Sequence, residues 1–336
     1  MQLLQHTPLK DYTTFRIGGP ARHFCTVKTI EEVQCACLWA HNNNWKLCVL
    51  GGGSNVLIAD EGFDGLVMHI ALTGIEQQGD TFTVAAGEVW DDFVAYVVAK
   101  GYGELANLSL IPGTVGAAPI QNIGAYGREV CAFITHVLCV HTTTGEHKTF
   151  SNAECAFTYR GSFFKTVAGK EWVIVKVIFA LSRTAMLDTS YKDIAEYAQK
   201  NNLAYFSPQS LRDTVIAIRR AKLPDWTALG TAGSYFKNPV ISWAALAQLQ
   251  KAYPGIPSFP FAHTMVKVSA GWILDKICNA QGMREGDAGI YEKQALVIVN
   301  HGHATAYNVR TLAEKLRTVV HEKTNIHLET EVQYIS

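Results

Sequence analysis

The alternation of apolar and polar residues along the chain predicts a series of helices and strands connected by glycine-rich turns. Thr29 and Glu32 have the spacing of a capping box in front of an apolar run, which predicts a helix over roughly 29–42. A strand over 46–50 follows, and a further apolar run covers 56–59 after a glycine turn. Two strands joined in this way differ from the strand, turn and helix of a Rossmann unit.

The middle of the chain combines strand-like segments with one long stretch that lacks periodicity. Alternating residues over 81–84 predict a strand, and the segment 89–100 predicts a helix. Residues 101–130 are rich in glycine and show little helical or strand periodicity. From about Ile134 the pattern is typical of strands again, with a hairpin around 144–146.

Further helices and strands complete this part of the chain. We expect a short capped helix at 151–154, a strand over 172–181 and a helix over 194–200. Ser207 as N-cap, with a proline in the first turn after it, predicts another helix that extends to Arg220.

The segment Leu223-Pro224-Asp225 has the composition of a domain linker. Beyond it, helices near 243–251 and 307–323 flank a strand over 294–300. This arrangement predicts a separate α/β unit in the last third of the chain.

Composition and charge indicate an ordinary globular protein. Hydrophobic residues make up 48% and charged residues 17% of the 336 residues, which excludes a disordered or collagen-like chain. The 29 basic and 29 acidic residues cancel, so the bulk charge favours neither nucleic acid nor an anionic membrane as a partner. We therefore expect a small, locally recognised ligand.

Neither a secretion signal nor a membrane span is predicted. The longest apolar run, near 172–181, is interrupted by Lys176 and is too short to cross a bilayer. The eight cysteines stand mostly in apolar stretches and form no paired metal-binding motif. We therefore expect a soluble cytoplasmic protein with buried, reduced cysteines and no metal site.

Residues 51–55, Gly51-Gly52-Gly53-Ser54-Asn55, form the first segment that can carry chemistry. Three glycines let a ligand approach the backbone closely, and consecutive N–H groups in such a turn can bind phosphate. No Gly-Lys-Ser/Thr follows, which argues against a P-loop. Taken alone, the segment fits an ordinary tight turn equally well.

Residues 111–127 form a second and more specific segment. They include four glycines and two prolines, which give an irregular but stiff backbone able to lie against a flat ligand. The alternative is a buried connection between domains. A loop of this length without regular structure is more often functional.

Six segments in chain order together resemble the UDP-N-acetylenolpyruvoylglucosamine reductases, a flavoenzyme family often called MurB. The segments are 14–19, 50–57, 111–127, Tyr159-Arg160, 232–239 and 328–335. The resemblance implies noncovalently bound FAD, NADPH as reductant and a cytoplasmic step of peptidoglycan precursor synthesis, with roles in cell-wall biogenesis, cell shape and cell division. It also implies an α+β fold: a two-part FAD-binding region of the vanillyl-alcohol-oxidase (PCMH-like) type and a C-terminal α/β substrate domain.

The resemblance assigns domains and FAD-binding positions to this chain. FAD-binding subdomain 1 covers 1–69, with the C-terminal strand 326–336 returning to it, subdomain 2 covers 70–222 and the substrate-binding domain covers 223–325. The residues that match the family's FAD-binding motifs are Leu50, Gly51, Gly52, Gly53, Ser54, Asn55, Val56, Ile111, Pro112, Gly113, Thr114, Gly116, Ala117, Ile120, Gln121, Ile123, Gly124, Ala125 and Tyr126.

Two residues match catalytic positions of the family and suit the reaction. Hydride transfer to an enolpyruvyl ether builds negative charge next to a carboxylate and then requires a proton. Arg160 matches the family's carboxylate-binding arginine, whose guanidinium stays charged and can bind in a bidentate manner. Ser234 matches the proton donor, which needs help from a neighbouring cation or acid. On position alone, Arg160 would be a surface ion pair and Ser234 a turn residue.

The C-terminal segment supplies the third catalytic position. Residues 326–335 alternate as a strand, so Glu329 and Glu331 share one face. Because the family's catalytic glutamate directly precedes a valine, the match selects Glu331; without it both carboxylates would be solvated edge charges. The family commonly has arginine where Gln333 stands.

Four further residues match substrate contacts of the family. Tyr191 corresponds to a tyrosine on a loop that closes over the nucleotide, Lys222 and Asn238 to positions facing the diphosphate and sugar, and Gln294 to a further contact. The alternatives are a solvated linker charge for Lys222 and a core aromatic for Tyr191.

Three functions are compared on this basis. The leading one is NADPH-dependent reduction of UDP-N-acetylglucosamine enolpyruvate to UDP-N-acetylmuramate on FAD. An FAD-dependent oxidase of a small hydroxy acid or sugar keeps the fold and changes the chemistry. A noncatalytic flavin or nucleotide-sugar binding protein would lack the catalytic residues, and Arg160, Ser234 and Glu331 are all present. The expected partner is the small-molecule substrate, with the chain as a monomer or weak oligomer.

Overall fold

The computed structural model describes all residues, Met1–Ser336, and divides into two compact units. Unit 1 comprises Met1–Thr7, Ala21–Gly52 and Phe63–Ala221, and unit 2 comprises Pro8–Pro20, Gly53–Gly62 and Lys222–Ser336. Each unit has its own hydrophobic core. The three-domain boundaries drawn from the sequence stay a prediction.

Unit 1 contains two main sheets. The first has the strand order β1-β2-β5-β3, in which β5 runs parallel to β2 and β3. The second has the order β11-β10-β12-β7-β6 and is antiparallel. The strands are β1 (Leu3–Pro8), β2 (Pro20–Val27), β3 (Lys46–Leu50), β5 (Phe63–Ile70), β6 (Ile75–Gln78), β7 (Thr81–Ala85), β10 (Ile134–His141), β11 (His147–Ser151) and β12 (Trp172–Ala180). A short hairpin joins β8 (Gly124–Ala125) and β9 (Arg128–Glu129).

The helices of unit 1 pack against these sheets. They are α1 (Ile30–Asn42), α2 (Trp90–Ala99), α3 (Lys192–Lys200) and α4 (Pro208–Lys222). Helix α1 contacts β3 and β5 of the first sheet and β10 of the second, so it lies between them. In α2, Phe93 packs on Phe82 and Phe179 of the second sheet, with ring centroids 6.2 and 4.9 Å apart.

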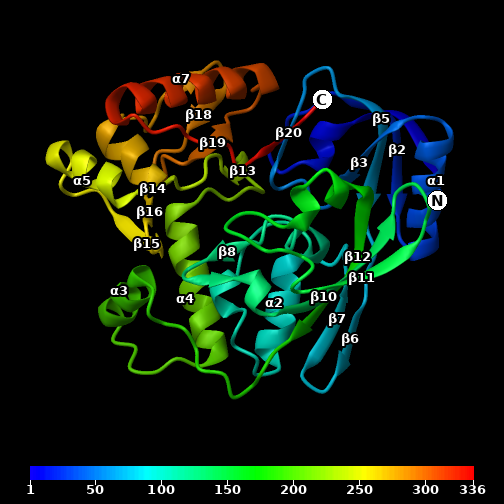
Figure 1. The fold of residues 1–336 in the computed structure, drawn as a ribbon, viewed down its shortest axis with the longest axis horizontal. Helices are drawn as coiled ribbons and strands as arrows, with labels where there is room; N and C mark the ends of the chain where they lie inside the picture. The colour runs from blue at the N-terminus through cyan, green and yellow to red at the C-terminus, as the bar shows by residue number, and fades with distance from the viewer. The chain divides into compact units, whose positions relative to one another are not determined.

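Unit 2 contains three smaller sheets. Their orders are β13-β19-β18-β17, β14-β16-β15 and β20-β4, the last pair being parallel. The strands are β4 (Val56–Ile58), β13 (Gly230–Ser234), β14 (Val240–Ser242), β15 (Ser258–Ala262), β16 (Met265–Val268), β17 (Arg284–Glu285), β18 (Ala288–Ile290), β19 (Val297–Asn300) and β20 (Gln333–Ile335). The helices are α5 (Trp243–Ala252), α6 (Ala270–Trp272) and α7 (Ala306–Thr324). Figure 1 shows α7 along β18 and β19.

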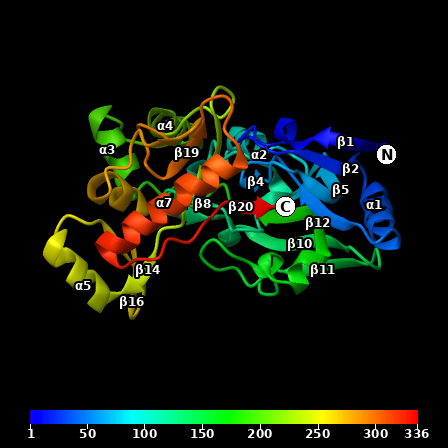
Figure 2. The same ribbon diagram turned by 90° about the horizontal axis from the view of Figure 1, so that it is seen from above.

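The segment Gly53–Gly62 is attached to unit 2 at both of its ends. Strand β4 pairs with β20, and Figure 2 shows the C-terminal segment running back from α7 to β20. Asp60 then caps α7, because its carboxylate accepts hydrogen bonds from the N–H groups of Ala306 (2.7 Å) and Tyr307 (3.0 Å). A carboxylate at a helix N-terminus is stabilising.

Most of the predicted elements form where the sequence places them and three differ, whereas strands such as β1, β2, β5 and β13 to β18 were not predicted. The predicted helix at 151–154 is only a turn: Ser151 and Glu154 do form mutual hydrogen bonds, but Ala156 takes a left-handed conformation (φ 45°) that stops any helix. The predicted strand 294–300 begins at Val297, since a turn precedes it. The predicted C-terminal strand forms only over Gln333–Ile335, with a single bridge before it at Thr330.

The cysteines agree with the earlier expectation only in part. All eight cysteines are free thiols; Cys25, Cys37, Cys139 and Cys155 are buried, whereas Cys35 is exposed, so the expectation of buried cysteines is wrong there. No helix is long and apolar enough to cross a membrane.

Candidate functional site

The two glycine-rich segments predicted from the sequence meet in unit 1. A Cβ on Gly51 would lie 2.6 Å from Oγ1 of Thr114, and a Cβ on Gly52 would lie 3.0 Å from Cα of Gly113. Both distances are too short for a side chain, so the close approach of the two backbones requires glycine at these positions. We call residues 51–55 the glycine turn and residues 111–127 the long loop.

The start of the long loop is fixed to the connection between β7 and α2. The carbonyl of Gly113 accepts a hydrogen bond from the N–H of Trp90 (3.0 Å), and the N–H of Val115 donates to Glu88 (2.9 Å). The N–H of Gly116 donates to the carbonyl of Ala86 (2.8 Å). These bonds hold the loop in place although it contains little regular structure.

Open backbone donors remain where the glycine turn and the long loop meet. The N–H groups of Gly51, Gly52, Gly113 and Thr114 donate to no backbone carbonyl. Neighbouring N–H groups without acceptors form a concavity of positive potential, which suits phosphate oxygens. The unit therefore presents the kind of backbone cradle that a dinucleotide requires.

The rest of the long loop packs on the core. Ile111, Ile120, Ile123, Ala125 and Tyr126 contact the hydrophobic core of unit 1 while remaining partly exposed. The loop is therefore packed on the core, and its role in ligand binding stays a prediction. Of the other predicted cofactor residues, Leu50 is buried at the end of β3.

Arg160 stands at the tip of a tight turn, residues 158–161, which we call the Arg160 turn. Thr158 and Gly161 close it with two backbone hydrogen bonds of 3.0 and 3.1 Å. The Arg160 guanidinium donates from Nη2 to the carbonyl of Gly124 in the long loop (2.9 Å) and lies over the ring of Tyr159, 5.2 Å from its centroid. These contacts place Arg160 at the long loop.

Two more contacts tie the Arg160 turn to the long loop. Asn122, buried in the loop, donates from Nδ2 to the carbonyl of Thr158 (3.1 Å) and to the carboxylate of Glu129 (2.9 Å). Ser162 donates from Oγ to the carbonyl of Ile120 (2.7 Å). No role was predicted for Asn122. The one feature of the sequence that could have indicated its burial is that it is an amide in a largely apolar loop.

Tyr191 lies against the same loop. It is the N-cap residue of α3, is 37% exposed and meets the ring of Tyr126 edge to face with centroids 5.3 Å apart. A core aromatic would not be so exposed. Burial raises the pKa of Tyr126 to about 12, so its hydroxyl is neutral and can donate a hydrogen bond at physiological pH.

A buried polar cluster beneath the long loop escaped the sequence analysis. Asp91 in α2 forms a two-point ion pair with Arg212 in α4, and its carboxylate also accepts from the N–H of Leu110, the residue before the loop. Arg219, about two helical turns further along α4, lies near Tyr126, and its Nε is buried without a partner. Charged residues in an amphipathic helix gave no sign of burial, because their partners are distant in sequence.

The remaining residues of the glycine turn belong to unit 2. Gly53 has φ of 60°, and a Cβ there would lie 2.0 Å from the carbonyl oxygen of Tyr12. Asn55 donates from Nδ2 to the carbonyl of Glu331 (3.2 Å) and accepts from the N–H of Gln333 (2.9 Å). These contacts place Asn55 beside the predicted catalytic glutamate; Ser54 precedes Asn55 and Val56 opens β4.

Ser234 stands at the end of β13, where the strand is irregular. The register of β13 on β19 shifts between Thr231 and Ser234, and Gly233 has φ of 75°. A bulge of this kind re-aims the next side chain. The N–H of Glu331 donates to the carbonyl of Tyr235 (2.8 Å), so the backbones of the two predicted catalytic residues of unit 2 are neighbours.

The structure distinguishes the two carboxylates of the C-terminal segment. The Glu329 side chain is 75% exposed and pairs with Lys237 (2.9 Å), as a solvated surface charge does. Glu331 is half-buried.

The predicted substrate residues of unit 2 fall into two places. The Asn238 side-chain oxygen accepts from the N–H of Ala270 (3.0 Å), and a Cβ on Gly271 would lie 2.9 Å from Oε1 of Gln294. Asn238 and Gln294 therefore both lie at the start of α6. Lys222 is exposed at the end of α4, next to the predicted linker.

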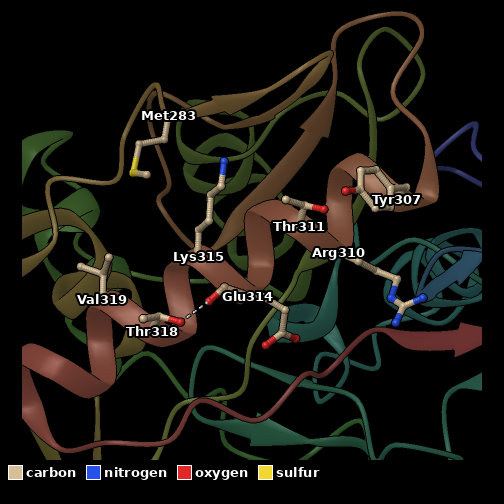
Figure 3. A pocket seen from close by; sticks show the side chains of 8 residues that line it. All are labelled: Met283, Tyr307, Arg310, Thr311, Glu314, Lys315, Thr318 and Val319. Atoms are coloured by element: carbon tan, nitrogen blue, oxygen red, sulfur yellow. Dashed lines mark hydrogen bonds between the residues drawn. The ribbon is translucent and has the colours of Figure 1, made fainter.

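A separate cavity of about 760 Å³ runs along α7 and contains none of the predicted site residues. Figure 3 shows its lining side chains: Met283, Tyr307, Arg310, Thr311, Glu314, Lys315, Thr318 and Val319. Two of its charged side chains already have partners within the protein: the Arg310 guanidinium lies over the ring of Tyr334, and Lys315 forms an ion pair with Glu285.

The comparisons with known proteins agree with this arrangement. A model of the FAD binding domain matches residues 21–151, and a model of the UDP-N-acetylenolpyruvoylglucosamine reductase C-terminal domain matches residues 225–335. Together with the cradle of open N–H groups, these matches define a flavoenzyme that binds FAD and confirm the predicted fold class.

Individual relatives extend over the whole chain. UDP-N-acetylenolpyruvoylglucosamine reductases of Chromobacterium violaceum and Pseudomonas putida are 43% and 40% identical, each covering 98% of both chains. The crystal structure of the reductase from Thermus caldophilus covers 100% of this chain and 98% of its own, with a TM-score of 0.70 at 26% identity. This chain belongs to the UDP-N-acetylenolpyruvoylglucosamine reductase family.

Proposed function

We propose that the protein uses NADPH to reduce UDP-N-acetylglucosamine enolpyruvate to UDP-N-acetylmuramate, a cytoplasmic step of peptidoglycan precursor synthesis. The observation that carries the proposal is the strand irregularity that precedes Ser234 together with the hydrogen bond between Glu331 and the next residue, Tyr235, in a chain 43% identical to a named reductase. FAD, when bound, accepts hydride from the reduced nicotinamide and delivers it to the enolpyruvyl double bond.

The backbone donors of unit 1 are proposed to bind the cofactor. The open N–H groups of Gly51, Gly52, Gly113 and Thr114 would donate hydrogen bonds to phosphate oxygens, since they donate to no backbone carbonyl of the protein. The cradle has no room for larger side chains at Gly51 and Gly52. The long loop would lie along the flat ring system.

The catalytic residues are assigned by charge and proton chemistry. Arg160 binds the substrate carboxylate, and its bond to the Gly124 carbonyl orients the guanidinium for that purpose. Ser234 delivers the proton to the carbon next to the carboxylate, and Glu331 assists as the neighbouring acid. Tyr191, Lys222, Asn238 and Gln294 hold the nucleotide and sugar.

The Ser234→Ala variant tests the proton-donor role. Flavin reduction by NADPH is expected to proceed at the wild-type rate, whereas reoxidation by the enolpyruvyl sugar nucleotide slows by about 10²- to 10⁴-fold. Anaerobic stopped-flow absorbance of the flavin band measures both half-reactions separately. Equal slowing of both would remove Ser234 from this role.

The two glutamates of the C-terminal segment provide a matched control. Glu331→Gln should slow reoxidation selectively, while Glu329→Gln removes a solvated carboxylate and should leave both half-reactions unchanged. Oxygen uptake with a panel of hydroxy acids tests the oxidase alternative. Turnover of that panel in place of the sugar nucleotide would overturn the proposed function.

A further inference from the structure

Asn107 occupies an unusual position in unit 1. It lies in a single 3₁₀ turn, Ala106–Leu108, and only 1% of it is exposed. Its amide donates one hydrogen bond to the carbonyl of Tyr126 in the long loop (3.0 Å) and a second to the carbonyl of Asp188 (2.9 Å). One buried amide therefore joins two segments that are far apart in the chain.

A second connection reinforces the first. The Asp188 carboxylate pairs through Oδ2 with Nε of Arg128 (3.1 Å) in the hairpin that follows Tyr126. Its Oδ1 accepts from both the N–H (3.1 Å) and the hydroxyl (2.6 Å) of Ser190. The residue next to this turn is Tyr191.

Tyr191 is held close to the long loop as a result. A Cβ on Gly127 would lie 3.6 Å from Oδ2 of Asp188 and 3.9 Å from Cδ2 of Tyr191, so both side chains border the same glycine. On the other side of Asp188, Leu187 packs against the core. The segment is thus anchored before and behind Asp188 while the Tyr191 ring stays 37% exposed.

We propose that Asn107, Arg128 and Asp188 form a latch that positions Tyr191 against Tyr126 for contact with the nucleotide of the substrate. The inference rests on the proposed function and adds to it three positioning residues. The latch acts before the ligand arrives, because a pre-ordered tyrosine loses less conformational freedom on binding. It contacts no reacting atom, so hydride transfer itself should not depend on it.

The Asn107→Ala variant tests the latch in the FAD-loaded enzyme. The Kd for UDP-N-acetylglucosamine enolpyruvate, measured from perturbation of the flavin absorbance, should rise by about three- to tenfold, the effect of losing the amide's hydrogen bonds. The rate of flavin reduction by NADPH should stay unchanged. An unchanged Kd for the sugar nucleotide overturns the latch.

A double-mutant cycle separates positioning from a general structural role. In a Tyr191→Ala background, Asn107→Ala should have no further effect on the Kd, because the residue that the latch positions is gone. An undiminished effect in that background overturns the proposal. Asp188→Asn removes the charge that pairs with Arg128 but keeps the backbone carbonyl that Asn107 binds. It should raise the Kd in the wild-type background and not in the Tyr191→Ala background. This variant keeps the proposal testable even if Asn107→Ala does not fold.

Asn152 offers a matched control. Its amide also bridges two carbonyls, those of Cys131 (2.8 Å) and Ile134 (2.7 Å), away from Tyr191. Asn107→Ala should accelerate amide hydrogen exchange at 188–191 in the free enzyme, and Asn152→Ala should not; equal exchange in both variants overturns the latch. If the wild-type enzyme does not bind the sugar nucleotide, both the proposed function and the latch are overturned. If it binds normally and Asn107→Ala does not change the Kd, only the latch is overturned.

Discussion

Four residues that are not glycine have left-handed backbones. They lie just before the long loop, in its middle, at its end and in the Arg160 turn. Their φ angles are 57° at Leu110, 46° at Asn122, 47° at Tyr126 and 54° at Arg160. Such conformations persist only when surrounding contacts hold them, and they concentrate at functional sites. Here the contacts are hydrogen bonds: Asp91 holds Leu110, and Asn122 holds Thr158 beside Arg160.

Asn122→Ala should therefore lower the free energy of unfolding by about 2–3 kcal/mol, since a buried amide with several partners is lost and alanine tolerates φ of 46° less well. Urea unfolding of the apoprotein measures the change. Glycine adopts this φ without strain. If the lost hydrogen bonds cause the destabilisation, Asn122→Gly should therefore show most of the same decrease in the free energy of unfolding. Full recovery in the glycine variant would contradict this explanation.

At the scale of elements, the ion pair between Asp91 and Arg212 joins α2 to α4. The two side chains are 21% and 10% exposed, and the Arg212 nitrogens lie 2.6 and 2.9 Å from the carboxylate oxygens. Burial alone would raise the pKa of Asp91, but hydrogen bonds from Arg212 and from the N–H of Leu110 hold it below its ordinary value of 3.8. The pair thereby links helix packing to the entrance of the long loop.

The sign of the pH dependence follows from this pKa. Because the folded-state pKa of Asp91 is depressed, its stabilisation is present above the unfolded-state value of 3.8 and is lost as the pH falls through the folded-state value. Asp91→Asn should lower the free energy of unfolding by roughly 3 kcal/mol near neutral pH and weaken its decline in acid. Urea unfolding between about pH 7 and pH 3 provides the test. A variant whose acid profile matches the wild type would exclude this role.

Elements with local signals were predictable from the sequence. Helix α1 begins where the Thr29 and Glu32 pair places it, and α4 begins after Ser207, whose hydroxyl accepts from the N–H of Ser210 (3.1 Å). The same kind of signal failed at 151–154, because Ser151 and Glu154 stabilise a turn as readily as a helix when no amphipathic run follows. The C-terminal strand proved short because its parallel partner β4 begins only at Val56, so the residues before Gln333 have no strand to pair with beyond the single bridge of Thr330 to Phe236.

At the scale of the molecule, the cradle couples cofactor binding to stability. FAD at about one hundred times its Kd should stabilise the folded protein by about 2.7 kcal/mol and raise its Tm. Gly52→Ala places a Cβ 3.0 Å from Gly113 and should reduce this shift. Gly255→Ala is the control, because its nearest neighbour would be 3.7 Å away. Thermal unfolding followed by circular dichroism, with and without FAD, gives both shifts; an equal shift in both variants would exclude the cradle as the FAD site.

Parts of the candidate site, like parts of the fold, could be predicted from the sequence, and other parts could not. The glycine turn and the long loop are continuous segments, so their composition marks them as candidate ligand contacts, although the turn taken alone fits an ordinary tight turn equally well. Asn107, Asn122 and Asp91 act through partners distant in the chain, and polar residues in loops and helix starts are usually exposed. Their burial became evident only once the fold was known.

The pairing of β4 with β20 bears on how the protein is made. Val56 pairs with Gln333, so this sheet of unit 2 cannot form until the residues of β20 have left the ribosome. Until then β4 presents an open edge, to which chaperones or other nascent chains could bind. A chain that lacks Gln333–Ile335 would keep that edge of β4 without its strand partner.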